Sequence, residues 1–359
     1  MTFCGSCFRV SGYVLVVLIA IYAYFYVECQ QESREKEEAG KMVVKEEFKP
    51  EETDVKDVPL NFCKYGESMN TDLGLWFMFG SSLPCPLIKL VSFLSSSNYQ
   101  TGLKADDKSV EQKVTIYDAR KNSPGSFHET GFTLVELEDD PETTEWRSNE
   151  QSNENADIKK FHKQMEPHIK ALYPDAKKIL WTTNVVRGGD KFMDQPKALG
   201  APHLDYHQNK TARVEFHEEF PALDFGLSEP KILLGDMDGD EGTFKVMLGV
   251  WKPIHPAVVC DHPLAVMDAK TFHSDNQTPN NLHMDLLFFT YHNLNGAISH
   301  SPDQKWYYYP FQTTKEVLVF HQYSDGEWLS NPHTSFLNKN CPEGSESRIS
   351  VELRVALFF

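Results

Sequence analysis

Short apolar runs, separated by Gly, Pro, Asn and Asp, dominate the chain from about residue 58 onward. The runs are rich in β-branched and aromatic residues and have the length of strands. The clearest of them cover residues 114–119, 131–137, 178–187, 244–254, 263–269, 316–323 and 348–359. This pattern predicts a fold built mainly from short β-strands.

One segment follows the helical period instead. In residues 157–172 the apolar side chains recur every three or four positions, which predicts an amphipathic helix with one buried stripe. The stripe consists of Ile158, Phe161, Met165, Ile169 and Leu172. Asp157 stands where an N-cap is expected. Many short strands with one or two flanking helices predict a mainly β fold of the sandwich, barrel or double-sheet jelly-roll type.

The last run, residues 348–359, alternates so strictly that its two faces differ in chemistry. One face is apolar, and the other carries Arg348, Ser350, Glu352 and Arg354. A polar face of this kind usually points into water. If it is buried, it forms a polar pocket in which an arginine needs an anionic partner. The pattern alone leaves both interpretations open.

The N-terminus has a different character. Residues 10–27 contain no charged side chain, and as a helix they extend about 27 Å, close to the roughly 30 Å of a bilayer core. A cleaved signal peptide is the alternative, but the run is long and lacks a clear small-x-small cleavage site. We therefore expect a membrane anchor at 1–27, an acidic stalk at 28–57 and one folded domain at 58–359, with the lipid bilayer as a partner of residues 10–27.

Charge and composition restrict the other partners and the compartment. The net charge of −17 argues against nucleic acid, because phosphates need a basic face. The acidic flank after the apolar run favours a lumenal main domain, although the nearby lysines and arginines do not agree. Sequons at Asn209 and Asn276 are compatible with that orientation. The cysteines beyond the stalk are scattered and indicate neither a zinc site nor a disulfide framework.

Two tripeptides have the pattern of half a metal site. His203 and Asp205 in APHLDYH, and His283 and Asp285 in NLHMDLL, each place an imidazole and a carboxylate two residues apart. On a strand, residues i and i+2 share a face, so either pair supplies two neighbouring ligands. Two imidazoles and one carboxylate bind Fe(II) on one face and leave positions for a co-substrate and oxygen. The tripeptide alone does not choose between the pairs.

The third ligand has to come from a distant strand. The histidines that follow both tripeptides are His292, His300, His321 and His333. Fifteen residues after His333 comes Arg348, and Ser350 follows it. An arginine grips a carboxylate through two parallel hydrogen bonds, and a serine on the same face adds a hydroxyl. A His-x-Asp pair, a distant histidine and Arg-x-Ser on a late strand form the layout that a 2-oxoglutarate oxygenase needs.

Several blocks of the chain resemble, in order, a known family. APHLDYH, QKWYYYPFQTTKEVLVFHQYSD, NPHTSF and RISVELR are similar to the fungal and bacterial hydroxylase/desaturase family, which includes gibberellin desaturase-like enzymes and the cephem methoxylation component. GFTLVEL, VWKPI and PLAVMDA resemble further blocks, so the resemblance runs from about residue 115 to the C-terminus. It implies a double-stranded β-helix, a cupin-like jelly roll, with Fe(II), 2-oxoglutarate and O2 chemistry. The membrane segment and the stalk depart from this mostly soluble family.

The resemblance carries over to three metal ligands. His203 and Asp205 match the family's H-x-D-Y, and His333 matches the histidine of its P-H-T-x-F block. The second tripeptide, with His283 and Asp285, falls where no family block is recognised. The resemblance therefore implies that iron binds to His203, Asp205 and His333.

Two arginines are candidates for binding the distal carboxylate of 2-oxoglutarate, because Arg348 and Arg354 both match the family's R-x-S-I-E-x-R ending. Six residues along a strand separate them by about 20 Å, so only one reaches a metal-bound acid. Arg348 has the better spacing from His333 and has Ser350 beside it. We therefore expect Arg348 and Ser350 to hold 2-oxoglutarate, with Arg354 as the alternative.

Three residues are candidates for contact with the substrate. His207 shares strand parity with Asp205, Arg187 ends a strand that borders the expected pocket, and Trp306 belongs to the aromatic block WYYYP. Each has an ordinary structural alternative: a rim residue, a turn and a core aromatic, respectively.

These patterns predict an Fe(II)- and 2-oxoglutarate-dependent oxidoreductase that hydroxylates or desaturates a small organic metabolite at a C–H bond. Two alternatives stay open. In a non-catalytic, membrane-tethered jelly-roll binding protein the three predicted ligands would be scattered. A cupin-type metalloenzyme that does not use 2-oxoglutarate would keep the three ligands but turn Arg348 towards solvent.

Overall fold

The computed structural model describes residues 53–63, 69–72, 104–105, 109–138, 156–188, 200–219, 242–254, 258–286, 289–325, 330–342, 345 and 348–359. The predicted anchor at 10–27 and most of the predicted stalk lie outside these residues. Among the helices that are described, none is both long enough and apolar enough to cross a bilayer.

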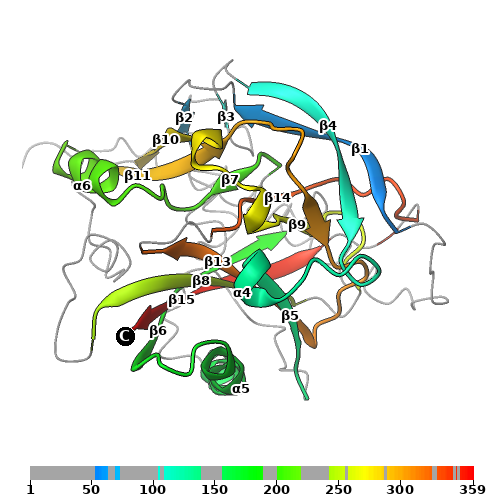
Figure 1. Ribbon diagram of the computed structural model, residues 1–359, viewed down its shortest axis with the longest axis horizontal. Helices are drawn as coiled ribbons and strands as arrows, with labels where there is room; N and C mark the ends of the chain where they lie inside the picture. Colours follow the sequence, from blue (N-terminus) through cyan, green and yellow to red (C-terminus); the bar gives the residue numbers. More distant parts are fainter. Residues whose placement is uncertain are drawn as a thin grey trace, which may run out of the picture.

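The described strands form two sheets that face each other (Figure 1). The larger sheet has the order β1-β4-β12-β9-β14-β7-β11-β10-β2-β3, and the smaller has the order β5-β13-β8-β15-β6. The larger sheet contains β1 (Val55–Cys63), β2 (Met69–Asp72), β3 (Lys104–Ala105), β4 (Ser109–Asp118), β7 (His203–Leu204), β9 (Leu264–Met267), β10 (Gln277–Leu286), β11 (Phe289–Ile298), β12 (Trp306–Tyr308) and β14 (His333–Ser335). The smaller sheet contains β5 (Phe132–Glu136), β6 (Lys178–Gly188), β8 (Phe244–Pro253), β13 (Glu316–Ser324) and β15 (Ile349–Phe358). Most neighbours are antiparallel, which gives the mainly β, jelly-roll type of fold that the apolar runs predict.

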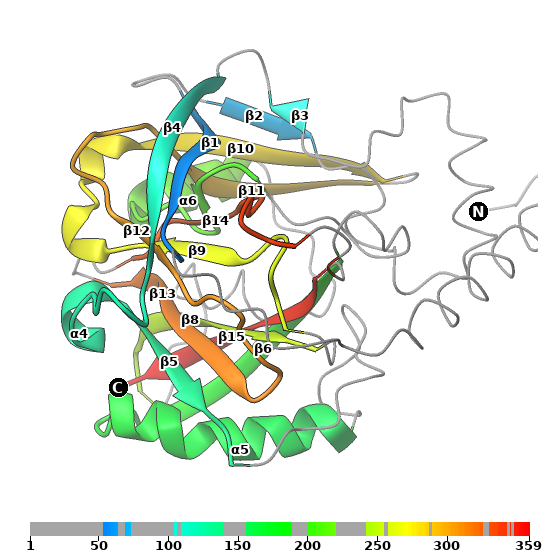
Figure 2. The same ribbon diagram turned by 90° about the vertical axis from the view of Figure 1, so that its right-hand side faces the viewer.

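Helix α5 (Ala156–Leu172) lies across the outer face of the smaller sheet (Figure 2). The predicted stripe is confirmed, because Ile158, Phe161, Met165 and Ile169 are fully buried in one cluster with that sheet. Burial of each side chain stabilises the fold by about 1.5–3 kcal/mol. The helix begins one residue before Asp157, which therefore lies in the first turn and is not the cap.

The remaining helices are short. They are α4 (Phe127–Thr130), α6 (Lys210–Glu219) and the 3-10 turns η1 (Ala269–Thr271) and η2 (Ser274–Asn276). Figure 2 shows α6 beside strands of the larger sheet and α5 along the smaller sheet. The two faces of the fold thus have different coverings, with only the smaller sheet covered by a long described helix.

Strand β1 corrects the predicted boundary between stalk and domain. Val55 and Val58 are 2% and 1% exposed, and β1 pairs with β4, so residues before 58 already belong to the folded sheet. Asp57 has a positive φ of 53°, and the register shifts between Val55 and Val58. This bulge interrupts the alternation of apolar residues, which explains why the sequence pattern hides the start of the strand.

Both faces of strand β15 are buried, but in different surroundings. Val351, Leu353, Val355 and Leu357 pack into the cluster that contains α5. The opposite face points between the two sheets, and its side chains are also buried, with Arg348 3%, Ser350 1% and Glu352 7% exposed. The polar face therefore lines the interior of the jelly roll rather than facing water.

Candidate metal centre

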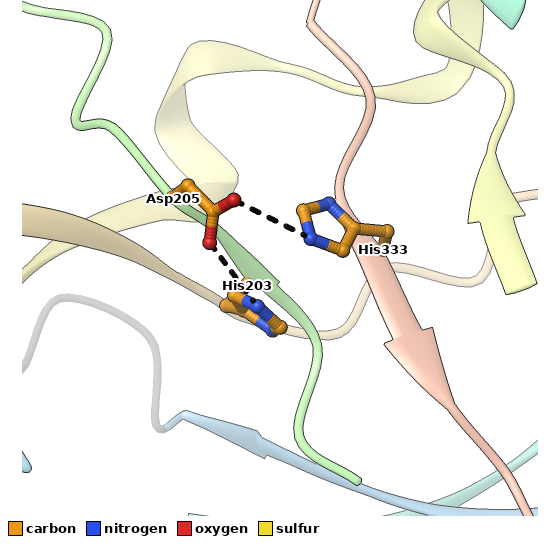
Figure 3. A group of neighbouring side chains, drawn as sticks. All are labelled: His203, Asp205 and His333. Carbon is orange, nitrogen blue, oxygen red and sulfur yellow. Dashed lines mark ion pairs between the residues drawn. The ribbon is translucent and has the colours of Figure 1, made fainter. Parts of the chain in front are cut away.

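Three side chains converge: His203 on β7, His333 on the neighbouring β14, and Asp205 in the bend that follows β7 (Figure 3). β7 and β14 are adjacent, and His333 lies directly opposite His203. One ligand atom from each of His203, Asp205 and His333 lies within 4.8 Å of the others. Nε2 of His203 is 3.6 Å from Oδ1 of Asp205, and Nε2 of His333 is 4.0 Å from Oδ2. This spacing suits three ligands of one ion, and the three residues are those that the family resemblance implies.

The local backbone reaches this geometry in an unexpected way. Strand β7 ends at Leu204, and Asp205 lies in a bend rather than on an extended strand. Strand parity therefore explains His203 but not Asp205. The bend turns the carboxylate of Asp205 back beside the imidazole of His203, which gives the same juxtaposition from a different conformation.

Backbone carbonyls select the tautomer of both imidazoles. Nδ1 of His203 is 2.8 Å from the carbonyl of Ala201, and Nδ1 of His333 is 3.2 Å from that of Asn331. A carbonyl only accepts, so each Nδ1 donates and each Nε2 keeps its lone pair for a metal. Burial and the neighbouring His333 lower the pKa of His203 to about 4, and burial also lowers the pKa of His333. Both rings are neutral at physiological pH.

Asp205 is held ionised by its neighbours. Its Oδ2 accepts hydrogen bonds from Nε2 of Gln322 and Nη2 of Arg354, both at 2.8 Å. Burial alone would raise the pKa of this carboxyl, but Arg354 and the two histidines hold it well below its usual range. Gln322 also donates to Glu352 at 2.8 Å, and burial together with Asp205 raises the pKa of Glu352 to about 7. The carboxylate of Asp205 is thus fixed, with Oδ1 turned towards His203.

The metal-free protein is expected to lose stability as the pH falls from 6.5 towards 4. Burial lowers the pKa of His162 to about 4 and that of His321 to about 3, as it does for His203. An unfolded histidine titrates near 6.5, so the unfolded chain binds more protons in this window. Each histidine should cost on the order of 1–2 kcal/mol by pH 5. Urea unfolding midpoints measured at pH 7, 6 and 5 check this.

His162 offers a control for the pH dependence, because its ring stacks on Trp181 with centroids 4.0 Å apart. The His162→Phe variant replaces a titrating ring by an apolar one of similar shape and should show a shallower dependence on pH. Midpoints that do not change between pH 7 and 5 in the unsubstituted protein would contradict the prediction.

Asn331 connects the histidine on β14 to the rest of the fold. Its Nδ2 donates to the carbonyls of Thr130 and Met267 at 2.7 and 2.8 Å, and its Oδ1 accepts from the backbone of His321 at 3.0 Å. Its own carbonyl accepts from Nδ1 of His333. Because Asn331 is fully buried, it ties β14 to both sheets and sets the orientation of the imidazole of His333.

Gly131→Ala is expected to disturb this tie. Gly131 has φ +85°, and an added Cβ would overlap the side-chain amide of Asn331. We expect a loss of about 1–3 kcal/mol from backbone strain, together with weaker metal binding through His333. Gly200→Ala is the matched control, because its added Cβ meets nothing closer than 3.9 Å. Chemical denaturation and metal titration of both variants measure the effects; equal stabilities would contradict the expectation.

The predicted co-substrate residues lie in the same interior. Arg348 lies with its guanidinium carbon 5.4 Å from the ring centre of Trp251, and Arg187 on β6 lies opposite Ser350. Burial and Arg187 lower the pKa of Arg348 to about 9, so it stays charged at neutral pH. Nε of Arg348 and Oγ of Ser350 are buried and have no hydrogen-bond partner among the described residues. Arg354 differs, because it contacts the carboxylate of Asp205.

Two of the candidates for substrate contact are placed differently from the prediction. Trp306 is fully buried in a core cluster that includes Phe62, so it does not offer a stacking surface to a substrate. His207 follows the bend at Asp205, so strand parity does not apply to it. It is 7% exposed, its Nδ1 accepts from the backbone of Asn209 at 3.3 Å, and its carbonyl accepts from Arg213.

The strand register separates the rival pair from the three converging residues. His203 lies opposite Ala297 on β11, and Ala297 lies opposite Thr278 on β10. His283 is five residues further along β10, a displacement of about 17 Å along the strand, and Asp285 is further still. The backbone therefore places this pair away from the group around His333.

Several residues around the centre have no signal in the sequence. Gln322 and Asn331 hold Asp205 and His333 in place, but each stands in an ordinary strand or loop context. Cys260 and Cys341 are joined by a disulfide with Cα atoms 5.5 Å apart, although they are 81 residues apart in the sequence. Only the folded chain brings these partners together.

The fold and the site define a class: a jelly-roll protein with two histidines on neighbouring strands and one carboxylate in the bend beside them, the ligand set of non-haem Fe(II) oxygenases. A family model described as "Oxidoreductase/YMDC permease-like domain" matches residues 93–358, about three quarters of the chain. The chain belongs to that family. Proteins named as iron- and 2-oxoglutarate-dependent enzymes are among those that resemble this chain.

One curated relative is the "Fe(II)/2-oxoglutarate-dependent dioxygenase nvfI" of Aspergillus novofumigatus (strain IBT 16806), which is 31% identical over 116 residues. That match covers 30% of this chain and 39% of the relative. A solved structure of the "iron and alpha-ketoglutarate-dependent endoperoxidase NvfI" is similar with a TM-score of 0.57, 19% identity, and coverage of 85% of this chain and 98% of the other. A structure of NvfI "with different conformation" has the same TM-score at 20% identity. The structural likeness is one of fold.

Proposed function

We propose that the protein is an Fe(II)- and 2-oxoglutarate-dependent oxygenase that oxidises a C–H bond of a small organic metabolite. The observation that carries the proposal is the convergence of His203, Asp205 and His333, with both imidazoles turned so that Nε2 faces the carboxylate. Relatives named as iron- and 2-oxoglutarate-dependent enzymes support the choice of metal and co-substrate. Both hydroxylation and desaturation are compatible with this site.

In this proposal His203, Asp205 and His333 hold Fe(II) on one face of the ion. Bound Fe(II), with 2-oxoglutarate and O2, supplies oxidation of a C–H bond with release of succinate and carbon dioxide. Gln322 and Arg354 hold one oxygen of Asp205 through hydrogen bonds and leave the other for the metal. The neutral histidines and the ionised carboxylate are the protonation states that a divalent cation requires.

Arg348 and Ser350 are assigned to the distal carboxylate of 2-oxoglutarate. Nε of the buried Arg348 guanidinium and the neighbouring hydroxyl of Ser350 have no partner within the described part of the chain, and an anion would accept hydrogen bonds from both. The 3% exposure of Arg348 also argues against the cupin-type alternative, in which it would face solvent. Arg354 has a different role: its contact with Asp205 makes it a positioning residue for this metal ligand.

A direct experiment tests the proposed function. The purified protein, titrated anaerobically with Fe(II) and then 2-oxoglutarate, should develop a weak visible charge-transfer band. On admission of O2 it should release succinate. If the protein shows neither the band nor succinate, and His203→Ala is indistinguishable from it, the proposal fails.

For localisation, we propose that residues 10–27 anchor the chain in a membrane and that the folded domain faces an oxidising lumen or the cell exterior. The disulfide between Cys260 and Cys341 supports such a compartment, because cytosolic thiols are kept reduced. The apolar run supports the anchor. A glycan at a sequon would report the same orientation independently.

The two sequons differ in their surroundings. Asn209 is exposed just before α6, and its Oδ1 accepts from the backbone of Ala212 at 3.2 Å, so Nδ2 is turned to the outside and suits a glycan. Asn276 is 9% exposed, and a glycan is incompatible with its place in the fold. Expression in a eukaryotic host should give one glycan, lost in Asn209→Gln and retained in Asn276→Gln. A protein without a glycosidase-sensitive mobility shift would contradict a lumenal domain.

A further inference from the structure

Arg348 is anchored by a segment almost ninety residues before it in the chain. The backbone N–H of Arg348 donates to Oδ1 of Asp261 at 3.0 Å, and its Nη1 donates to the carbonyl of His262 at 2.6 Å. Trp251 lies against the guanidinium on another side. Arg348 is thus held by one hydrogen bond from its backbone, one hydrogen bond from its guanidinium and one ring, while its Nε has no hydrogen-bond partner among the described residues.

Asp261 is the centre of this anchor. Oδ1 also accepts from the backbone of His262 at 2.7 Å, and Oδ2 lies 3.1 Å from Nδ1 of the same histidine. The carbonyl of Asp261 accepts from the backbone of Asn338 at 2.9 Å. One carboxylate therefore shapes the turn at 260–262 and binds the start of the strand that follows Arg348.

The disulfide fastens the same turn. Cys260 precedes Asp261, and its partner Cys341 lies on the connection that leads from β14 to Arg348. Cys260 is 5% exposed, so the bond lies within the packed part of the fold. The covalent link and the contact between Asn338 and Asp261 join the same two segments, and the link limits how far they separate when the structure fluctuates.

We propose that Asp261, fastened by the Cys260–Cys341 disulfide, is a positioning residue that holds Arg348 ready for the distal carboxylate of 2-oxoglutarate. The inference rests on the proposed function, which assigns Arg348 to that carboxylate. A long arginine side chain has many rotamers, and binding a carboxylate through a fixed fork requires that they be restricted beforehand. The turn provides this restriction without contacting the co-substrate itself.

Equilibrium binding of 2-oxoglutarate to the anaerobic Fe(II)-loaded full chain, measured by calorimetry, tests the proposal. Asp261→Ala and the Cys260→Ser/Cys341→Ser double variant should bind 2-oxoglutarate roughly 10–100-fold more weakly, by analogy with the loss that follows when a residue orienting a metal ligand is removed. Their affinity for Fe(II) alone should change less than about twofold, because the metal ligands are untouched. Asp261→Asn should recover much of the affinity, since its Oδ1 still accepts both N–H groups.

Asp118→Ala is the matched control. Asp118 is 2% exposed and also accepts a backbone N–H, that of Arg120 at 2.7 Å, but it lies on β4. It should lower stability without changing the affinity for 2-oxoglutarate. If Asp261→Ala does not fold, the Cys260→Ser/Cys341→Ser double variant is compared with the wild type instead.

Two outcomes overturn the inference, and they are distinguishable. If the wild type binds 2-oxoglutarate and the Asp261 and cysteine variants bind it equally well but unfold at lower temperature, the turn is structural only. If the wild type binds Fe(II) but no 2-oxoglutarate, the proposed function fails and the positioning role fails with it.

Discussion

His203→Ala is expected to abolish stoichiometric Fe(II) binding and to lower succinate formation by more than about 100-fold. Loss of a residue that merely orients a metal ligand already costs roughly 10–100-fold, and this change removes a ligand itself. The histidine is 4.5 Å from the ring of His333, so its removal also leaves space beside the second imidazole. Anaerobic metal titration against a coloured chelator measures the affinity.

His283→Ala is the matched control, because it alters a histidine in the same His-x-Asp setting on β10. It should keep full affinity for Fe(II). Asp205→Asn and Asp285→Asn form a second pair with the same expected contrast and with little change in side-chain volume. Iron binding that survives in His203→Ala and is lost in His283→Ala would reject the site.

Arg348→Lys is expected to weaken 2-oxoglutarate binding while leaving Fe(II) binding intact. Lysine keeps the positive charge but loses the planar fork that binds a carboxylate through two hydrogen bonds. Loss of a hydrogen bond to a charged group costs about 1.5–3 kcal/mol, which corresponds to roughly 10–150-fold in the dissociation constant. Calorimetry on the iron-loaded protein measures this.

The companion variant Arg354→Lys should have the opposite pattern. Arg354 contacts Oδ2 of Asp205 at 2.8 Å, so its replacement should weaken Fe(II) binding and affect 2-oxoglutarate only through the metal. Measuring the affinities for Fe(II) and for 2-oxoglutarate in both variants distinguishes the roles of the two arginines better than activity alone. If Arg354→Lys raises the dissociation constant of 2-oxoglutarate and Arg348→Lys does not, the assignment of the two arginines is reversed.

Local patterns predict the secondary structure well where the period is regular. Each of the seven apolar runs coincides with a strand, and the stripe from Ile158 to Ile169 faces the core as expected. The pattern fails at β1, where a bulge at Asp57 breaks the alternation, and at the hairpin of β10 and β11, whose many polar residues conceal two long strands. In both places pairing with a neighbour, which a single sequence does not display, stabilises the strand.

The candidate site, too, is predicted only in part by the sequence. The residue types, their order and the family resemblance point to His203, Asp205 and His333, because ligand chemistry restricts which side chains serve. The same reasoning left Trp306 open between substrate contact and the core, and it misjudged the strand parity of Asp205 and His207, since burial and the bend after Leu204 depend on the neighbouring strands.

By itself, the sequence determined the class of fold, the one long amphipathic helix and the chemical type of the site, because these follow from side-chain chemistry and the periods of helices and strands. Only the tertiary structure decided that the polar face of β15 is buried, that Arg354 binds Asp205, and that Asp261 and a disulfide anchor Arg348. These contacts join segments far apart in the chain. Their partners are chosen by sheet register and packing, which no local pattern encodes.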